Sequence, residues 1–169
     1  MLLKIFGALI ITCSSLLFGI EKSNEYENRV TYLESMQFCV LQLENEIRYT
    51  QTPIFLALKK VSVNAHPIIK KLFYNTCNED ESGKTFFQLW TNSLDGISSE
   101  LFREDTHLFL SLGESIGCTD VEGQIKSIEL FKLKLNHQTQ AAKEVCQKNK
   151  KLYKSLGLYS GILITVLLL

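Results

Sequence analysis

The sequence is poor in the two residues that most often interrupt helices. Its 169 residues include two prolines and nine glycines, and these are the residues that α-helices tolerate least. A protein built from many short strands needs frequent turn residues, so the shortage argues against an all-β fold. The sequence therefore predicts long α-helices, and its length predicts a single folded domain.

The sequence also lacks an excess of either charge. Eighteen Lys and Arg balance eighteen Asp and Glu. Residues 21–169, which exclude Lys4, carry seventeen basic and eighteen acidic residues and are almost neutral as well. Proteins that bind nucleic acid through its phosphates carry a basic excess. We therefore expect no nucleic-acid partner.

The cysteines lack the spacing of a metal or redox site. No two of the five are closer than 26 residues in sequence: Cys13, Cys39, Cys77, Cys118 and Cys146. Zinc sites and thioredoxin-type centres use closely spaced pairs such as CxxC. Isolated thiols in an odd number indicate small buried side chains in a reducing compartment. We expect no bound metal.

One short motif resembles part of a nucleotide-binding loop. The segment 82–85 reads SGKT, the end of the phosphate-binding pattern GxxxxGK[ST]. Asn78 stands where the pattern requires its first glycine, and the upstream segment looks helical rather than extended. The segment is better explained as a polar turn in which Thr85 caps a helix.

Other catalytic patterns are missing too. His66, His107 and His137 are isolated, none has HExxH spacing, and no serine lies in a nucleophile elbow. Glu44 and Glu46 are two residues apart and cannot share one helix face. Such carboxylates suit salt bridges or a partner surface better than an acid–base dyad. We predict a non-catalytic protein without a cofactor or a small-molecule substrate.

Apolar residues gather at the N-terminal end. The segment from Leu2 to Ile20 contains one charge, Lys4, followed by 16 uncharged residues. With its flanks, this segment approaches the roughly 20 residues that span a bilayer. A cleaved signal peptide is the alternative, but the segment lacks a convincing small-x-small cleavage site. We predict a transmembrane anchor over residues 1–20.

The C-terminal end is apolar as well. Residues 156–169 carry no charge, and as a helix they rise about 21 Å, short of a hydrocarbon core of about 30 Å. The segment spans the bilayer if Lys151 and Lys154 extend to the interface, and otherwise it is a hydrophobic tail. A core helix of a helical bundle is the alternative. We predict a hydrophobic membrane segment over residues 156–169.

The charges beside these segments predict a topology. A basic run, KNKKLYK, occupies residues 148–154 on the inner side of the C-terminal segment. Basic flanks tend to remain in the cytoplasm, and isolated thiols agree with a reducing compartment. We therefore expect residues 21–155 to form a cytoplasmic domain, with both termini pointing away from the cytosol.

Apolar periodicity predicts the helices of residues 21–155. A first helix over 24–50 has a stripe at three- and four-residue steps, and short helices start near Pro53, Pro67, Thr85 and Leu101. A capping box over 119–122 precedes a helix with no breaker from residue 124 to 156. The predicted fold is all-α: an antiparallel bundle of about six helices, in which two long helices lead to the terminal membrane segments.

Three segments together resemble one protein family. Residues 44–58 (ENEIRYTQTPIFLAL), 112–124 (LGESIGCTDVEGQ) and 151–169 are similar in order and spacing to the stage III sporulation protein AB family. Ile54 and the pair Phe55-Leu56 depart from the usual family pattern. The resemblance implies similarity to the cytoplasmic F-type platform domain of type II secretion systems, an all-α bundle.

The resemblance also implies a function. Family members are expected in a channel complex between mother cell and forespore, in the mother-cell membrane around the forespore. The expected role is a non-catalytic platform required for endospore formation. The implied partners are a cytoplasmic secretion-type ATPase, other membrane proteins of the stage III sporulation complex, and membrane lipid. A membrane-tethered helical adaptor unrelated to secretion is the alternative.

Two segments are candidate partner-binding surfaces. The members of the first are Glu44, Glu46, Arg48, Tyr49, Thr52 and Pro53; those of the second are Gly113, Gly117, Asp120 and Gln124. Charged and loop positions often form interfaces. Each segment also has a purely structural explanation: Thr52 is the N-cap of a helix whose first residue is Pro53, the two glycines end a helix, and Asp120 starts one.

Overall fold

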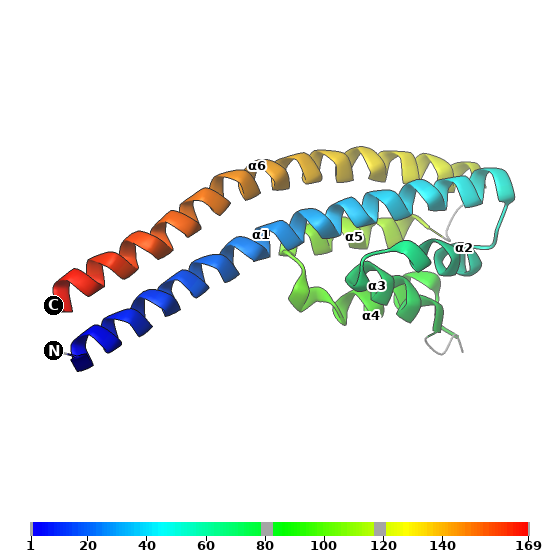
Figure 1. Cartoon of the computed structure of the whole chain (residues 1–169). Helices are drawn as coiled ribbons and strands as arrows, with labels where there is room; N and C mark the ends of the chain where they lie inside the picture. Colours follow the sequence, from blue (N-terminus) through cyan, green and yellow to red (C-terminus); the bar gives the residue numbers. More distant parts are fainter. Residues whose placement is uncertain (1, 79–82, 117–120, 169) are drawn as a thin grey trace. The chain divides into compact units, whose positions relative to one another are not determined.

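Helices account for almost all of the chain in the computed structural model, which describes residues 2–78, 83–116 and 121–168 (Figure 1). Within residues 2–12 and 154–168, it describes the side chains only of Gly7, Ile10, Ser155, Leu156 and Tyr159. The described residues contain six α-helices, two 3₁₀ turns and no strand. The prediction of an all-α helical bundle is therefore confirmed.

Two helices are much longer than the others. α1 covers Leu2–Thr50 and α6 covers Val121–Leu168. Between them lie α2 (Ile54–Val61), α3 (Pro67–Asn78), α4 (Phe86–Asp95) and α5 (Arg103–Ser115), with short 3₁₀ turns at Ser62–Asn64 and Ser98–Glu100. The scarcity of proline explains the two long helices, because no proline lies in either of them.

The chain divides into two compact units. Unit 1 comprises Met1–Val30 and Ala141–Leu169, and unit 2 comprises Thr31–Gln140. Each long helix contributes residues to both units. The two units are defined by how the chain packs. They do not test the predicted membrane boundaries at residues 20 and 156, which stay predictions.

Unit 2 has a continuous apolar core. The stripe predicted for α1 is buried: Leu33, Met36, Val40, Leu43 and Ile47 are each at most 4% exposed. The short helices α2 to α5 add buried apolar residues to this core, and α6 adds Ile128, Phe131 and Leu135. Cys39 is buried in the same core, where burial raises the pKa of its thiol to about 11. It therefore behaves as a small apolar side chain, as predicted from its isolation.

The start of α4 agrees with the prediction from the sequence. Thr85 is the N-cap of α4, its hydroxyl accepts a hydrogen bond from the Gln88 N–H at 3.3 Å, and the Gln88 side chain accepts one from the Thr85 N–H at 2.9 Å. This reciprocal capping box satisfies two backbone donors at the helix end. Thr85, the last residue of the SGKT motif, thus serves as a helix cap.

The start of α2 differs from the prediction. Pro53, rather than Thr52, is the N-cap residue of α2, and no side chain caps the helix. The Thr52 hydroxyl instead donates to a carboxylate oxygen of Glu46 at 2.7 Å. A charged acceptor makes the stronger hydrogen bond, which explains why this hydroxyl turns back toward α1.

Gly113 was predicted to end a helix, and this prediction is wrong. Gly113 lies inside α5, which continues to Ser115, and it is buried against the indole of Trp90. A Cβ atom at this position would lie 2.2 Å from the Trp90 ring. The Trp90 Nε1–H also donates to the Phe109 carbonyl of α5 at 3.0 Å. Glycine is used here because it lets α5 approach the aromatic ring closely.

Unit 1 pairs the outer parts of the two long helices. Glu27 of α1 forms an ion pair with Lys150 of α6, and the rings of Tyr26 and Tyr153 stack with centroids 5.9 Å apart. Among the side chains described, none of the helices shows an apolar stretch long enough to cross a membrane. The structure does not describe most side chains of the predicted membrane segments, residues 1–20 and 156–169.

Replacement of Gly113 tests the close packing in unit 2. We expect Gly113→Ala to lower the free energy of unfolding by about 1–3 kcal/mol, because the new methyl group overlaps the Trp90 ring. Urea unfolding followed by circular dichroism measures this change. Gly96→Ala is the matched control, since a Cβ there meets its nearest atom at an ordinary 3.5 Å. Equal stability of the two variants would contradict the close approach.

Candidate functional site

The C-terminal end of α1 has an unusual backbone. Gln51 adopts a positive φ of 51°, a conformation that glycine usually supplies at a helix end. The Thr52 N–H then donates to the Glu46 carbonyl at 3.2 Å. This reversal directs the chain back along α1 and brings the start of α2 close to Glu46.

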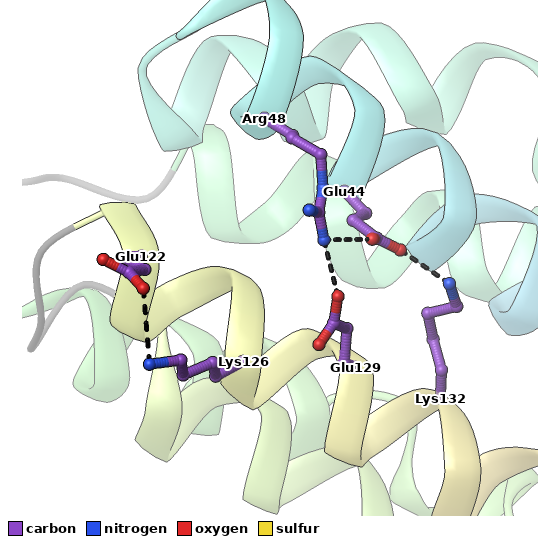
Figure 2. Close-up of polar contacts among 6 residues, drawn as sticks. All are labelled: Glu44, Arg48, Glu122, Lys126, Glu129 and Lys132. Atoms are coloured by element: carbon purple, nitrogen blue, oxygen red, sulfur yellow. Dashed lines mark hydrogen bonds and ion pairs between the residues drawn. The ribbon is translucent and has the colours of Figure 1, made fainter.

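Glu44 lies at the centre of a group of ion pairs between α1 and α6. One of its carboxylate oxygens accepts a hydrogen bond from Arg48 at 2.9 Å, and the other accepts one from Lys132 of α6 at 2.6 Å. Arg48 also donates to Glu129 of α6 at 2.6 Å. Figure 2 shows these four side chains converging from the two helices. We call them the Glu44 cluster.

Burial and charge compete at Glu44. Its side chain is 11% exposed, and burial on its own would raise the pKa of the carboxyl group. The hydrogen bonds from Lys132 and Arg48, with their positive charges, outweigh burial and hold the pKa below its usual value of 4.5. The two carboxylates raise the pKa of Arg48 in turn, first through Glu129 and then through Glu44. Glu44 and Arg48 are therefore both ionised at neutral pH.

Glu46 has separate partners on another side of α1. Its carboxylate accepts hydrogen bonds from Lys60 of α2 at 2.9 Å and from the Thr52 hydroxyl at 2.7 Å. These hydrogen bonds lower the pKa of Glu46. Two carboxylates two residues apart thus face different elements, as their spacing predicts. Neither geometry is that of a shared acid–base dyad.

Residues of the first candidate surface pair with one another, Glu44 with Arg48 and Glu46 with Thr52, whereas the structure describes two residues of the second, Gly113 and Gln124. Tyr49 is 79% exposed beside the Glu44 cluster, and Pro53 is exposed at the start of α2. Gln124 is half-buried in α6, whereas Gly113 is buried in the core. Gly117 and Asp120 lie outside the described residues. The role of either segment in binding a partner remains a prediction.

Three members of these ion pairs were not anticipated from the sequence: Lys60, the partner of Glu46; Lys132, a partner of Glu44; and Glu129, a partner of Arg48. Glu129 and Lys132 are three residues apart on α6 and so share one helix face. That spacing is a weak signal, because many charge pairs on exposed faces have it. Which cation Glu44 meets depends on how α1 and α6 align, and a sequence pattern does not specify this alignment.

Chemistry beyond ion pairing finds little support in the described part of the chain. Within residues 2–78, 83–116 and 121–168, no three His, Cys, Asp or Glu side chains lie close enough to hold a metal ion. A cavity of about 260 Å³ between α5 and α6 is lined by Ser111, Ser115 and Ser127. The hydroxyls of Ser111 and Ser115 donate to backbone carbonyls of α5, so no base activates them.

The fold and this site define a class: an all-α protein with two long paired helices and charged groups arranged as ion pairs between helices. Comparison with known proteins adds the family. The chain belongs to the stage III sporulation protein AB family, whose model matches residues 4–169.

Two relatives illustrate the match. The chain is 26% identical over 171 residues to stage III sporulation protein AB of Bacillus subtilis (strain 168), covering 99% of this chain and all of the relative. It is also similar to a solved structure of a stage III sporulation protein AB, with a TM-score of 0.65 at 21% identity. That match covers 71% of this chain and 97% of the solved one. The structural likeness supports the helical fold.

Neutralising Glu44 tests the energetic importance of the cluster. We expect Glu44→Gln to lower the free energy of unfolding at pH 7 by about 1–3 kcal/mol, because two cations lose their shared acceptor in a poorly solvated position. The control is Glu122→Gln. Glu122 pairs with Lys126 at 3.4 Å (Figure 2), but its side chain is 78% exposed. We therefore expect a loss below about 1 kcal/mol, the size of an exposed ion pair and of an acidic side chain in the first turn of a helix. Equal losses in both variants would contradict the special role of Glu44.

The lowered pKa of Glu44 predicts a pH dependence. Its stabilising contribution is fully present above its unfolded pKa of about 4.5 and is lost as the pH falls through the lower folded value. We therefore expect the stability difference between wild type and Glu44→Gln to be constant near neutral pH and to shrink below pH 4.5. Unfolding at a series of pH values measures this, and a difference that grows on acidification would refute it.

Proposed function

We propose that the chain is a non-catalytic membrane platform of a sporulation channel complex, and that its helical unit 2 docks a cytoplasmic secretion-type ATPase. In this proposal the complex lies between mother cell and forespore, and the protein is required for endospore formation. Membership of a family named for stage III of sporulation supports the biological setting.

One observation carries the platform proposal. α1 and α6 are each a single continuous helix that contains an apolar terminal sequence and also contributes to the core of unit 2. A continuous helix transmits displacement along its axis better than a flexible linker does. Two such helices, held to each other by ion pairs, suit a protein that couples cytoplasmic and membrane components.

The surface beside the Glu44 cluster is the proposed docking site. Tyr49 is the most exposed large apolar side chain among those described, and Arg48 next to it is held in place by two carboxylates. Tyrosine and arginine are enriched among residues that dominate binding energies. Because the arginine is already ordered by its ion pairs, less conformational entropy is lost when a partner binds.

Co-purification from sporulating cells tests the docking site. With the tagged full-length chain as bait, we expect Tyr49→Ala to reduce recovery of the ATPase by about tenfold or more, as for a dominant interface residue. Tyr74→Ala is the control, since Tyr74 is 55% exposed on α3, away from the cluster in sequence. Circular dichroism confirms that both variants fold.

The outcomes separate the alternatives. Normal recovery with Tyr49→Ala would show that the ATPase binds elsewhere. Absence of the ATPase even with the wild-type bait, together with normal spore formation in a deletion strain, would refute the platform and favour a membrane-tethered adaptor. Recovery of the chain in the membrane fraction tests attachment independently of the ATPase.

A further inference from the structure

The neutral charge of the whole chain conceals a separation of charge between the two units. Unit 1 contains eight Lys and Arg and four Glu, a net charge of +4. Unit 2 contains ten Lys and Arg and fourteen Asp and Glu, a net charge of −4. Unit 1 is also the unit that contains both apolar termini. Positive charge is therefore concentrated in the part of the chain that is richest in apolar sequence.

The α6 segment of unit 1 has two distinct faces. One face meets α1, where Lys150 pairs with Glu27 and Tyr153 stacks on Tyr26. The other face is exposed, and its members recur at three- and four-residue steps, which places them on one side of a helix. They are Lys148, Lys151, Leu152, Leu156 and Tyr159. We call this the Lys148–Tyr159 face.

The basic end of this face has unsatisfied positive charge. Lys148 and Lys151 are exposed and form no ion pair among the residues described. They line a shallow hollow of about 300 Å³ together with Gln147 and Glu144. One carboxylate against two ammonium groups leaves a net positive charge there, which suits an anionic ligand.

The opposite end of the face is apolar. Leu152, Leu156 and Tyr159 are 54%, 59% and 67% exposed. From Lys151 to Leu156 the helix rises about 7.5 Å, close to the thickness of one lipid headgroup layer, about 5–8 Å. The succession of lysine, leucine and tyrosine along one face matches the order of polar and apolar layers at a bilayer surface.

α1 changes from polar to apolar at the same level. The Glu27–Lys150 ion pair gives a common reference point on the two helices. Six residues beyond it, toward the apolar ends, α1 reaches Glu21 and α6 reaches Leu156. Beyond Glu21, the α1 residues Ile20, Phe18 and Leu17 are exposed and apolar. The blue and red helix ends run side by side in Figure 1. Both helices thus change character in one plane.

We infer that the Lys148–Tyr159 face binds anionic phospholipid, with Lys148 and Lys151 on the phosphate headgroups and Leu156 and Tyr159 at the acyl boundary. The inference rests on the proposed membrane attachment and deepens it, since it specifies the lipid class. Paired apolar surfaces alone would insert equally well into neutral lipid. The two exposed lysines supply the selectivity.

Lipid selection by the full-length chain tests this inference. The protein is reconstituted into nanodiscs of about three parts phosphatidylcholine to one part phosphatidylglycerol, extracted in mild detergent, and its retained lipids are quantified by mass spectrometry. We expect the ratio of phosphatidylglycerol to phosphatidylcholine in the retained lipids to exceed the bulk ratio by roughly fivefold for each lysine, and this enrichment to fall in high salt. In Lys148→Gln/Lys151→Gln the enrichment should disappear.

The matched control removes the same charge from unit 2. Lys59→Gln/Lys70→Gln changes two exposed lysines of α2 and α3, and the enrichment should be unchanged. If the Lys148/Lys151 variant retains phosphatidylglycerol like the wild type, or if the wild type shows no enrichment, the inference is wrong. It is also wrong if the substitutions leave lipid unchanged but release a membrane protein that co-purifies from cells, because the face would then bind protein.

A second reconstitution distinguishes this inference from the proposed function. In nanodiscs of phosphatidylcholine alone, incorporation of the chain supports membrane attachment whatever the selectivity for headgroups. Incorporation without selectivity refutes only the lipid specificity. Failure to incorporate into either lipid refutes both the attachment and the inference.

Discussion

The buried carboxylate of Glu44 determines how the two long helices align in unit 2. It accepts hydrogen bonds from α1 and from α6, and Arg48 extends the pairing to Glu129. Displacement of one helix by a turn, about 5.4 Å, would separate Glu44 from Lys132 and Arg48 from Glu129, and would leave Glu44 with Arg48 as its one remaining cation. An apolar stripe tolerates several alignments more easily, because leucine and isoleucine side chains contact one another in many arrangements. The ion pairs therefore specify the register that the apolar core stabilises.

The four short helices are positioned by steric contacts of their own. They pack within the same unit, and their burial brings Trp90 against the glycine in α5. This contact needs α4 and α5 at one separation, since a bulkier residue at position 113 would overlap the indole. Charge complementarity between the long helices and steric complementarity between the short ones thus act together. The result is a unit in which polar and apolar contacts specify the same arrangement.

Local features of the fold were predictable, and features that depend on distant contacts were not. The apolar period of α1 and the capping of α4 by Thr85 follow from spacing within a few residues, and both predictions are confirmed. The positive φ of Gln51 was not anticipated, because glycine is the usual residue there. The position of Gly113 inside a helix was not predicted either, because the reason for it is a contact with Trp90, which is 23 positions away in sequence.

At the candidate site, the spacing of Glu44 and Glu46 predicted that their side chains point in different directions. Lys132 is 88 residues from Glu44, and no local pattern links the two.

Trp90 makes the protein a convenient optical system. It is the single tryptophan of the chain, it is fully buried, and its indole N–H is bound to a backbone carbonyl of α5. An indole in such surroundings emits at shorter wavelength than one in water, and excitation near 295 nm selects it over the six tyrosines. Because unit 1 contains tyrosines but no tryptophan, the emission reports on unit 2 alone. Ligands added to unit 1 can therefore be tested for an effect on unit 2 without any engineered label.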